Sequence, residues 1–205
     1  MPPFPSQEMD ALICGVLRDD PLGRVILHAS ESGDTHEIFT KRLARVPGCD
    51  ASRIHFLGAL PHHRLLALYS LSDVILDSYP AGGCTTTREV LAVGKALVTL
   101  PARLLGGRWS YAYYRIIGDD VLNSMVVADS PAEYVRLAVE LGTSAKVRDE
   151  AERRIKRGVH ALYESRDSIA AWNEVFLDIA PVVIDDGYYD DSSTLPPLVT
   201  LKAEL

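Results

Sequence analysis

The sequence has little cysteine, and its cysteines are not arranged for a metal. The three residues, Cys14, Cys49 and Cys84, are odd in number and far apart along the chain. None belongs to a CxxC pair or to the Cys/His spacing that is typical of zinc sites. Because disulfides are rare in reducing compartments, this usage leads us to expect a reducing, intracellular setting.

Long apolar runs and an excess of positive charge are also absent. No stretch reaches the roughly 18 apolar residues that a membrane-spanning helix needs, and the N-terminus lacks the pattern of a signal peptide. Lys and Arg number 21 against 28 for Asp and Glu, which gives a formal net charge of -7, whereas nucleic-acid binders usually carry a basic face. We therefore expect a soluble, cytoplasmic or nuclear protein that binds neither membranes nor nucleic acid.

Short β-branched runs alternate with amphipathic segments, which is typical of a parallel α/β layer. Strands are predicted at residues 24–28, 53–57, 73–77, 96–100 and 125–128, and helices at residues 8–17, 35–46, 62–71, 85–93, 109–117, 132–141, 144–163 and 168–179. We expect an α/β lobe with a Rossmann-like parallel sheet and flanking helices over residues 1–182. Residues 183–205 contain several acids and Pro196-Pro197, so we expect a disordered acidic tail there.

The segment from residue 73 to residue 98 carries the clearest chemical pattern, DVILDSYPAGGCTTTREVLAVGKALV. A buried strand leads into Gly82-Gly83, and Thr85 and Thr86 open the next helix. Ligands of open α/β sheets bind outside the carboxyl ends of the strands, and a helix N-terminus there favours an anion. Glu89 follows one helical turn later on the same face, where its carboxylate can accept hydrogen bonds from the two hydroxyls of a ribose.

A simpler interpretation of this segment stays open, in which Cys84 or Thr85 caps the helix and the glycines only make a turn. The segment contains neither the Walker pattern GxxxxGK[ST] nor the GxGxxG of dinucleotide-binding folds. A Rossmann oxidoreductase is therefore disfavoured.

The same region is similar to the C-terminal catalytic lobe of O-GlcNAc transferases and the related SPINDLY proteins. The resemblance extends over most of residues 10–180 and is densest at the glycine turn. The matching segments are RIHF at 53–56, LSDVILD at 71–77, GGCTTTREVLAVG at 82–94, VTLP at 98–101 and LAVELGT at 137–143, together with Pro61. It implies a GT-B architecture, in which two Rossmann-like lobes face each other across a cleft and the C-terminal lobe holds most of the UDP.

The resemblance also implies roles for individual residues. Cys84, Thr85 and Thr86 would face the diphosphate beside Gly83, and Glu89 would bind the ribose. Leu60 would offer backbone atoms to the uracil, and His62 stands where the family often has a Lys that reaches the ribose. The donor would be a UDP-sugar and the acceptor Ser or Thr of a protein, with inversion at the anomeric carbon and without a metal.

Three positions depart from the family pattern. Leu65 and Leu68 are apolar where O-GlcNAc transferases place His and Arg, which puts base stacking in doubt. The Lys that grips the diphosphate belongs just before the first helix of this lobe, where the sequence has Phe4 or no counterpart. The other GT-B lobe and the tetratricopeptide repeats that bind protein substrates are expected as missing partners.

Other polar residues give weaker indications. Asp73 and Asp77 bracket one strand on the same face, but nothing indicates that they face a cleft as paired glycosidase carboxylates do. His62-His63 is interpreted as an exposed helix start, and the Trp109–Tyr114 cluster as helix packing with a sugar-stacking role as the less favoured alternative. The main hypothesis is a UDP-GlcNAc-type protein glycosyltransferase lobe. The alternative is a truncated or diverged, non-catalytic module that binds a nucleotide or a protein.

Overall fold

The computed structural model describes residues 6–28, 33–163 and 165–185 of the chain. The helices are α1 (Gln7–Asp19), α2 (Gly33–Leu43), α3 (His62–Leu71), α4 (Thr85–Ala92), α5 (Trp109–Ile117), α6 (Asp120–Val126), α7 (Pro131–Thr143), α8 (Ala145–Gly158) and α9 (Arg166–Asp185). The strands are β1 (Val25–His28), β2 (Ile54–Leu57), β3 (Ile75–Leu76) and β4 (Leu97–Val98), and short 3-10 turns cover Ala51–Arg53 (η1), Leu105–Gly107 (η2) and Val159–Leu162 (η3).

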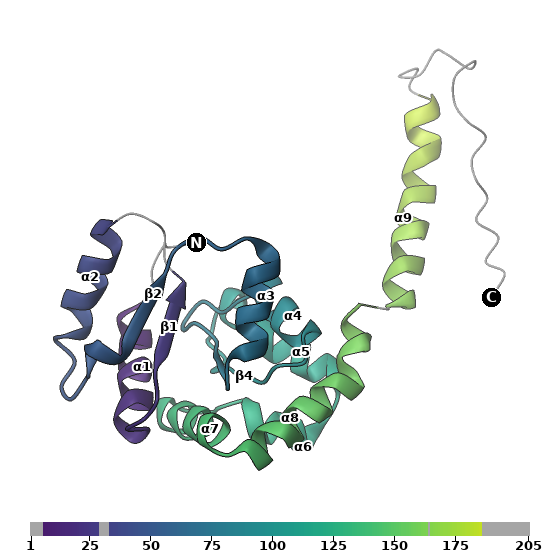
Figure 1. The fold of residues 1–205 in the computed structure, drawn as a ribbon. Coiled ribbons are helices and arrows are strands. Elements are labelled where there is room, and N and C mark those ends of the chain that lie inside the picture. The colour runs from purple at the N-terminus through teal and green to yellow at the C-terminus, as the bar shows by residue number, and fades with distance from the viewer. Residues whose placement is uncertain (1–5, 29–32, 164, 186–205) are drawn as a thin grey trace. The chain divides into compact units, whose positions relative to one another are not determined.

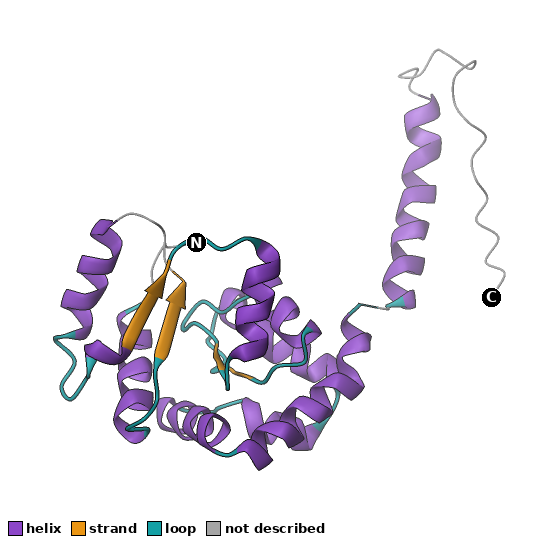
Figure 2. Cartoon of the chain, viewed as in Figure 1, coloured by secondary structure: helices purple, strands orange, loops and turns teal. Residues whose placement is uncertain are grey.

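The described strands pair in parallel, and helices surround them (Figures 1 and 2). β1 pairs with β2 from Val25–Ile54 to His28–Leu57, and β3 pairs with β4 through Ile75–Leu97 and Leu76–Val98. The predicted α/β class with parallel strands and flanking helices is confirmed.

Tyrosine hydroxyls from two helices bond to the backbone of β4 and of the residue after β3. Tyr114 of α5 is fully buried, and its hydroxyl donates to the Leu97 carbonyl at 2.8 Å and accepts from the Leu97 N–H at 3.2 Å. Tyr134 of α7 is also fully buried and donates to the carbonyl of Asp77 at 2.8 Å. Burial raises the pKa of both phenols, so both remain protonated donors at neutral pH.

Two predictions about the second half of the lobe were wrong in detail. The predicted strand at 125–128 shrinks to one bridge between Val127 and Thr99, because Met125 and Val126 form the last turn of α6. Asp119 caps this short helix by accepting from the Leu122 N–H at 2.9 Å, a start signal that the sequence analysis missed. The predicted helix at 144–163 ends at Gly158 and continues as the 3-10 turn η3.

The chain divides after Tyr163 into two compact units. Among the described residues of the second unit, α9 extends to Asp185, so residues 183–185 of the predicted tail are helical, while 186–205 and Phe4 lie outside the described residues. The rings of Trp172 and Phe176 stack within α9 with centroids 5.7 Å apart. In the described parts of the chain, we find no helix with the length and apolarity needed to cross a membrane. The proposal that one lobe extends to residue 182 stays a prediction.

The cysteines differ from the expectation of a reducing setting, because Cys14 and Cys49 form a disulfide. Cys14 is buried in α1, and Cys49 lies in the turn after α2, so the bond joins segments 35 residues apart. The pairing could not be read from the sequence, because the two cysteines are far apart in the chain and meet only when α1 packs beside the β1–α2–β2 unit. Cys84 is a free and exposed cysteine.

We expect the double variant Cys14→Ala/Cys49→Ala to lose about 3–4 kcal/mol of unfolding free energy, because the disulfide restricts the unfolded chain over a 35-residue separation. Urea denaturation of the variant and of oxidised and reduced wild type measures the effect. Cys84→Ala serves as the matched control and should unfold like wild type. Equal midpoints for oxidised and reduced wild type would contradict the prediction.

Candidate functional site

The predicted anion-binding turn lies between β3 and α4. Gly82 and Gly83 are buried, whereas Cys84, Thr85 and Thr86 are exposed at the start of the helix. Cys84 is the N-cap residue of α4, but its side chain makes no cap hydrogen bond to the helix. The interpretation in which Cys84 caps this helix with its side chain is therefore wrong, and the first turn presents its N–H groups together with two Thr hydroxyls.

Gly83 occupies a position where no side chain fits. A Cβ there would lie 2.6 Å from the Oγ1 atoms of both Thr86 and Thr87. Its N–H donates to Asp77 Oδ1 at 2.8 Å, so Gly83 provides space for close approach, and its N–H is already engaged. The donors that face outward come from the residues that follow.

Cys84 is joined by a tyrosine at the mouth of the turn. Its Sγ lies 3.3 Å from the hydroxyl of Tyr113 on α5. Burial, followed by the hydrogen bond with Cys84, raises the pKa of Tyr113 to about 12, so this phenol remains a donor at neutral pH. Tyr113 belongs to the Trp109–Tyr114 cluster that was predicted to serve helix packing, and its place beside Cys84 is set by a contact 29 residues away in the chain.

His62 and Glu89, predicted to contact the ribose, come together across 27 residues. His62 Nε2 at the start of α3 lies 3.0 Å from Glu89 Oε1 on α4. A carboxylate can accept about four hydrogen bonds, so this contact leaves Glu89 able to accept from a hydroxyl of a ligand. This contact brings the start of α3 next to the N-terminal half of α4.

The remaining predicted residues lie in or just before α3, the helix that begins at His62. Leu60 is half-buried in the loop that joins β2 to α3, one residue before Pro61, the N-cap of that helix. Leu65 and Leu68 are half-buried on α3. The backbone of residue 60 is thus in a loop, where its polar groups are not committed to a strand or helix.

The two aspartates of the β3 segment have different environments. Asp73 is exposed and pairs with Arg148 of α8 at 3.2 Å. Asp77 is only 5% exposed, and its Oδ2 accepts from Thr99 Oγ1 at 2.7 Å. Burial raises the pKa of Asp77, and hydrogen bonds from Ser110, the Gly83 N–H, Thr99 and Ser78 oppose this shift. Asp73 and Asp77 therefore do not form a catalytic pair. Asp77 instead supports the glycine turn through its hydrogen bond with the Gly83 N–H.

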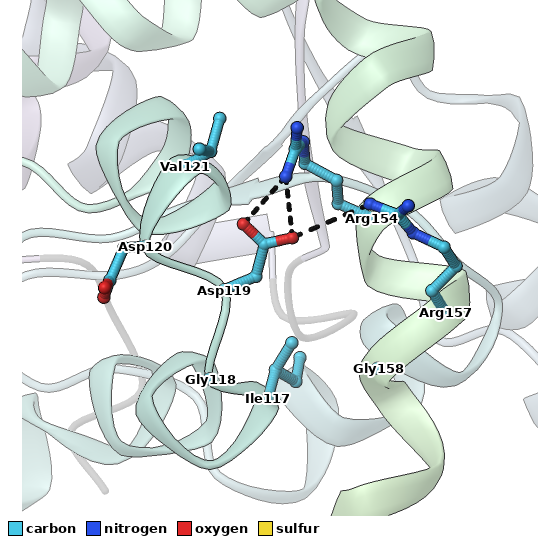
Figure 3. A pocket seen from close by; sticks show the side chains of 8 residues that line it. All are labelled: Ile117, Gly118, Asp119, Asp120, Val121, Arg154, Arg157 and Gly158. Carbon is cyan, nitrogen blue, oxygen red and sulfur yellow. Dashed lines mark hydrogen bonds and ion pairs between the residues drawn. The ribbon is translucent and has the colours of Figure 1, made fainter.

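A separate pocket of about 500 Å³ lies between the α5–α6 corner and α8 (Figure 3). The carboxylate of Asp119 points across it to Arg154, with Oδ2 and Oδ1 2.8 Å and 2.9 Å from Nη1, and lies 3.8 Å from Arg157. Hydrogen bonds from the Leu122 N–H and Arg154 lower the pKa of Asp119. Its carboxylate thus pairs with both arginines of the pocket, and none of the predicted site residues lines it.

Comparison with known proteins agrees with the predicted resemblance. Residues 25–170 match the family described as Glycosyl transferase family 41. A UDP-N-acetylglucosamine–peptide N-acetylglucosaminyltransferase from Caenorhabditis elegans is 35% identical over 98 residues, which cover 48% of this chain and 8% of that protein. The SPINDLY protein of Petunia hybrida is 30% identical over 113 residues, which cover 47% of this chain and 12% of that protein.

A solved structure shares the fold. The K341M mutant of Thermobaculum terrenum O-GlcNAc transferase superposes with a TM-score of 0.71 and 25% identity, over 86% of this chain and 34% of that chain. The parallel strands and flanking helices therefore match a lobe of an O-GlcNAc transferase. The chain spans about a tenth of the length of these two curated relatives and about a third of the solved structure.

We expect Asp119→Asn to lower the unfolding free energy at pH 7 by about 1–3 kcal/mol, because it removes a charged partner of Arg154 and keeps an oxygen to cap α6. The lowered pKa means that the ionised carboxylate stabilises the fold above its unfolded-state pKa of about 4, and that this stabilisation is lost as the pH falls through the folded-state value.

Urea denaturation of wild type and Asp119→Asn at pH 7 and at about pH 3 tests the prediction. The difference in unfolding free energy between wild type and Asp119→Asn should be smaller at about pH 3 than at pH 7. Asp120→Asn is the matched control, because that neighbouring side chain is exposed and lies 3.7 Å from Arg115. A difference that stays constant between the two pH values would refute the assignment.

Proposed function

The chain belongs to glycosyl transferase family 41, and we propose that it is the donor-binding lobe of a protein O-GlcNAc transferase-like enzyme. In this proposal the lobe binds a UDP-sugar, and the sugar passes to Ser or Thr of a protein with inversion at the anomeric carbon. The observation that carries the proposal is the opening of α4, where exposed Thr85 and Thr86 accompany N–H groups that lack a side-chain cap.

The diphosphate would lie at this helix start. First-turn N–H groups, the helix dipole and the two Thr hydroxyls all favour negative charge, and charge-assisted hydrogen bonds each contribute roughly 1.5–3 kcal/mol. The same groups would stabilise the UDP that departs during transfer, when negative charge grows on the leaving phosphate oxygen. No metal is needed for this role, and Tyr113 and the Cys84 thiol stand at the edge of the same turn.

The nucleoside would occupy the space between α3 and α4. Glu89 would accept from a ribose hydroxyl while His62 holds its carboxylate, and the Leu60 backbone would meet the uracil edge. Half-buried Leu65 and Leu68 offer an apolar surface in place of charged or aromatic contacts. The acceptor and the general base are assigned to parts of the enzyme beyond this lobe.

We expect Thr85→Ala/Thr86→Ala to weaken UDP binding about tenfold or more, since two hydroxyl donors to the diphosphate are lost. Calorimetry or NMR titration with UDP measures the change. Thr143→Ala is the matched control, because this exposed hydroxyl bonds only to its own helix, at the Val139 carbonyl. Unchanged UDP affinity in the double variant would show that the diphosphate does not bind at the start of α4.

The isolated chain should bind UDP with a dissociation constant of about 1 mM and transfer no sugar. Two or three charge-assisted bonds leave about 4–5 kcal/mol after the cost of immobilising the ligand. Catalysis also requires an acceptor hydroxyl held in line with the anomeric carbon, and such positioning accounts for roughly 7–11 kcal/mol of a barrier.

Radiolabelled sugar transfer to protein tests this expectation. The chain alone is compared with the chain fused behind the N-terminal lobe of a related transferase. Multiple turnovers by the chain alone would overturn the half-site proposal. Inactivity of both proteins, with UDP binding retained, would favour the second candidate function, a non-catalytic nucleotide-binding module.

A further inference from the structure

The backbone of Gly83 is held at its N–H and at its carbonyl by buried side chains. Its N–H donates to Asp77 Oδ1 at 2.8 Å, and its carbonyl accepts from Thr87 Oγ1 at 3.0 Å and from Ser110 Oγ at 3.5 Å. The Thr87 and Ser110 hydroxyls also bond to each other at 2.9 Å. The two backbone polar groups of one glycine thus connect the segment after β3, the first turn of α4 and the start of α5.

The carboxylate in this arrangement is costly for the fold. Asp77 is 5% exposed, and the hydrogen bonds that reach it, among the described residues, come from neutral donors such as Thr99 and the Gly83 N–H. Burial raises its pKa, which shows that the charged form is not favoured by its surroundings. Because burying a carboxylate without a cation usually costs several kcal/mol, its placement here indicates a requirement other than packing.

The contacts of Asp77 indicate that it orients the glycine turn. Thr99 fixes the far oxygen of Asp77, so the near oxygen sets the direction of the Gly83 N–H. Gly82 also packs against this carboxylate, because a Cβ on Gly82 would lie 2.8 Å from Asp77 Oδ2. With the backbone of Gly83 held in this way, the Thr87 side chain is buried, whereas Thr85 and Thr86 are exposed.

We propose that Asp77, supported by Thr99 and Ser110, is a positioning residue that aims the first-turn donors of α4 at the diphosphate of the nucleotide. This inference rests on the proposed function and deepens it. Asp77 does not touch the ligand. It acts by holding the backbone N–H of Gly83, and its contribution should therefore appear in the binding of the diphosphate and not in the binding of the nucleoside.

NMR titrations with UDP and with uridine separate these two contributions. Asp77→Ala should lose about tenfold in UDP affinity, the equivalent of one charge-assisted contact, while uridine affinity stays at the wild-type value. Asp77→Asn keeps an oxygen for the Gly83 N–H and should restore most of the UDP preference. Asp73→Asn is the matched control, because this exposed carboxylate on the same strand segment pairs with Arg148 away from the turn.

Each result decides a different point. Folded Asp77→Ala that prefers UDP over uridine as strongly as wild type overturns the positioning role. Wild type without any preference for UDP overturns the proposed function itself. If Asp77→Ala does not fold, Thr99→Val and Ser110→Ala decide, since each loosens the hold on the Gly83 backbone: a reduced UDP preference in both supports the inference, and an unchanged preference in both overturns it.

Discussion

The hydrogen bond from the Gly83 N–H to the buried carboxylate of Asp77 is the contact on which the candidate site depends. It lies behind the surface that a ligand would meet. Through Thr99 it is tied to the segment after β4, and through the Gly83 carbonyl it is tied to Thr87 and Ser110. The exposed donors at the start of α4 therefore take their orientation from a buried polar network, in a region where most of the lobe is packed with apolar side chains.

The exposed start of α4 lacks a good capping side chain. Helix α4 begins at Thr85 with a cysteine in the N-cap position, a poor residue for satisfying helix N–H groups. Stability alone would favour Ser or Asp there. The absence of a side-chain cap, the exposed hydroxyls and the His62–Glu89 contact are consistent with one another if an anionic nucleotide completes the helix start.

Much of this arrangement could be predicted from the sequence, because the signals are local. The starts of the helices at residues 62, 85 and 109 were predicted to the residue, since apolar periodicity and turn residues mark them directly. The turn at Gly82-Gly83 was recognised from its glycines and the hydroxyls after them. The importance of Asp77 was not, because its partners Thr99 and Ser110 lie 22 and 33 residues away and meet only in the fold. The disulfide between Cys14 and Cys49 escaped for the same reason.

The two buried tyrosines have a consequence for the alignment of the central strands. Strands of two residues, such as β3 and β4, specify their pairing register weakly, and a slip of one residue would turn Asp77 to the opposite face. The hydroxyl of Tyr114 bonds to the backbone of Leu97 in β4, and the hydroxyl of Tyr134 bonds to the carbonyl of Asp77, directly after β3. A slipped register would break these hydrogen bonds, so helices α5 and α7, which contribute no residue of the strands, help to fix the side of the sheet on which Asp77 lies.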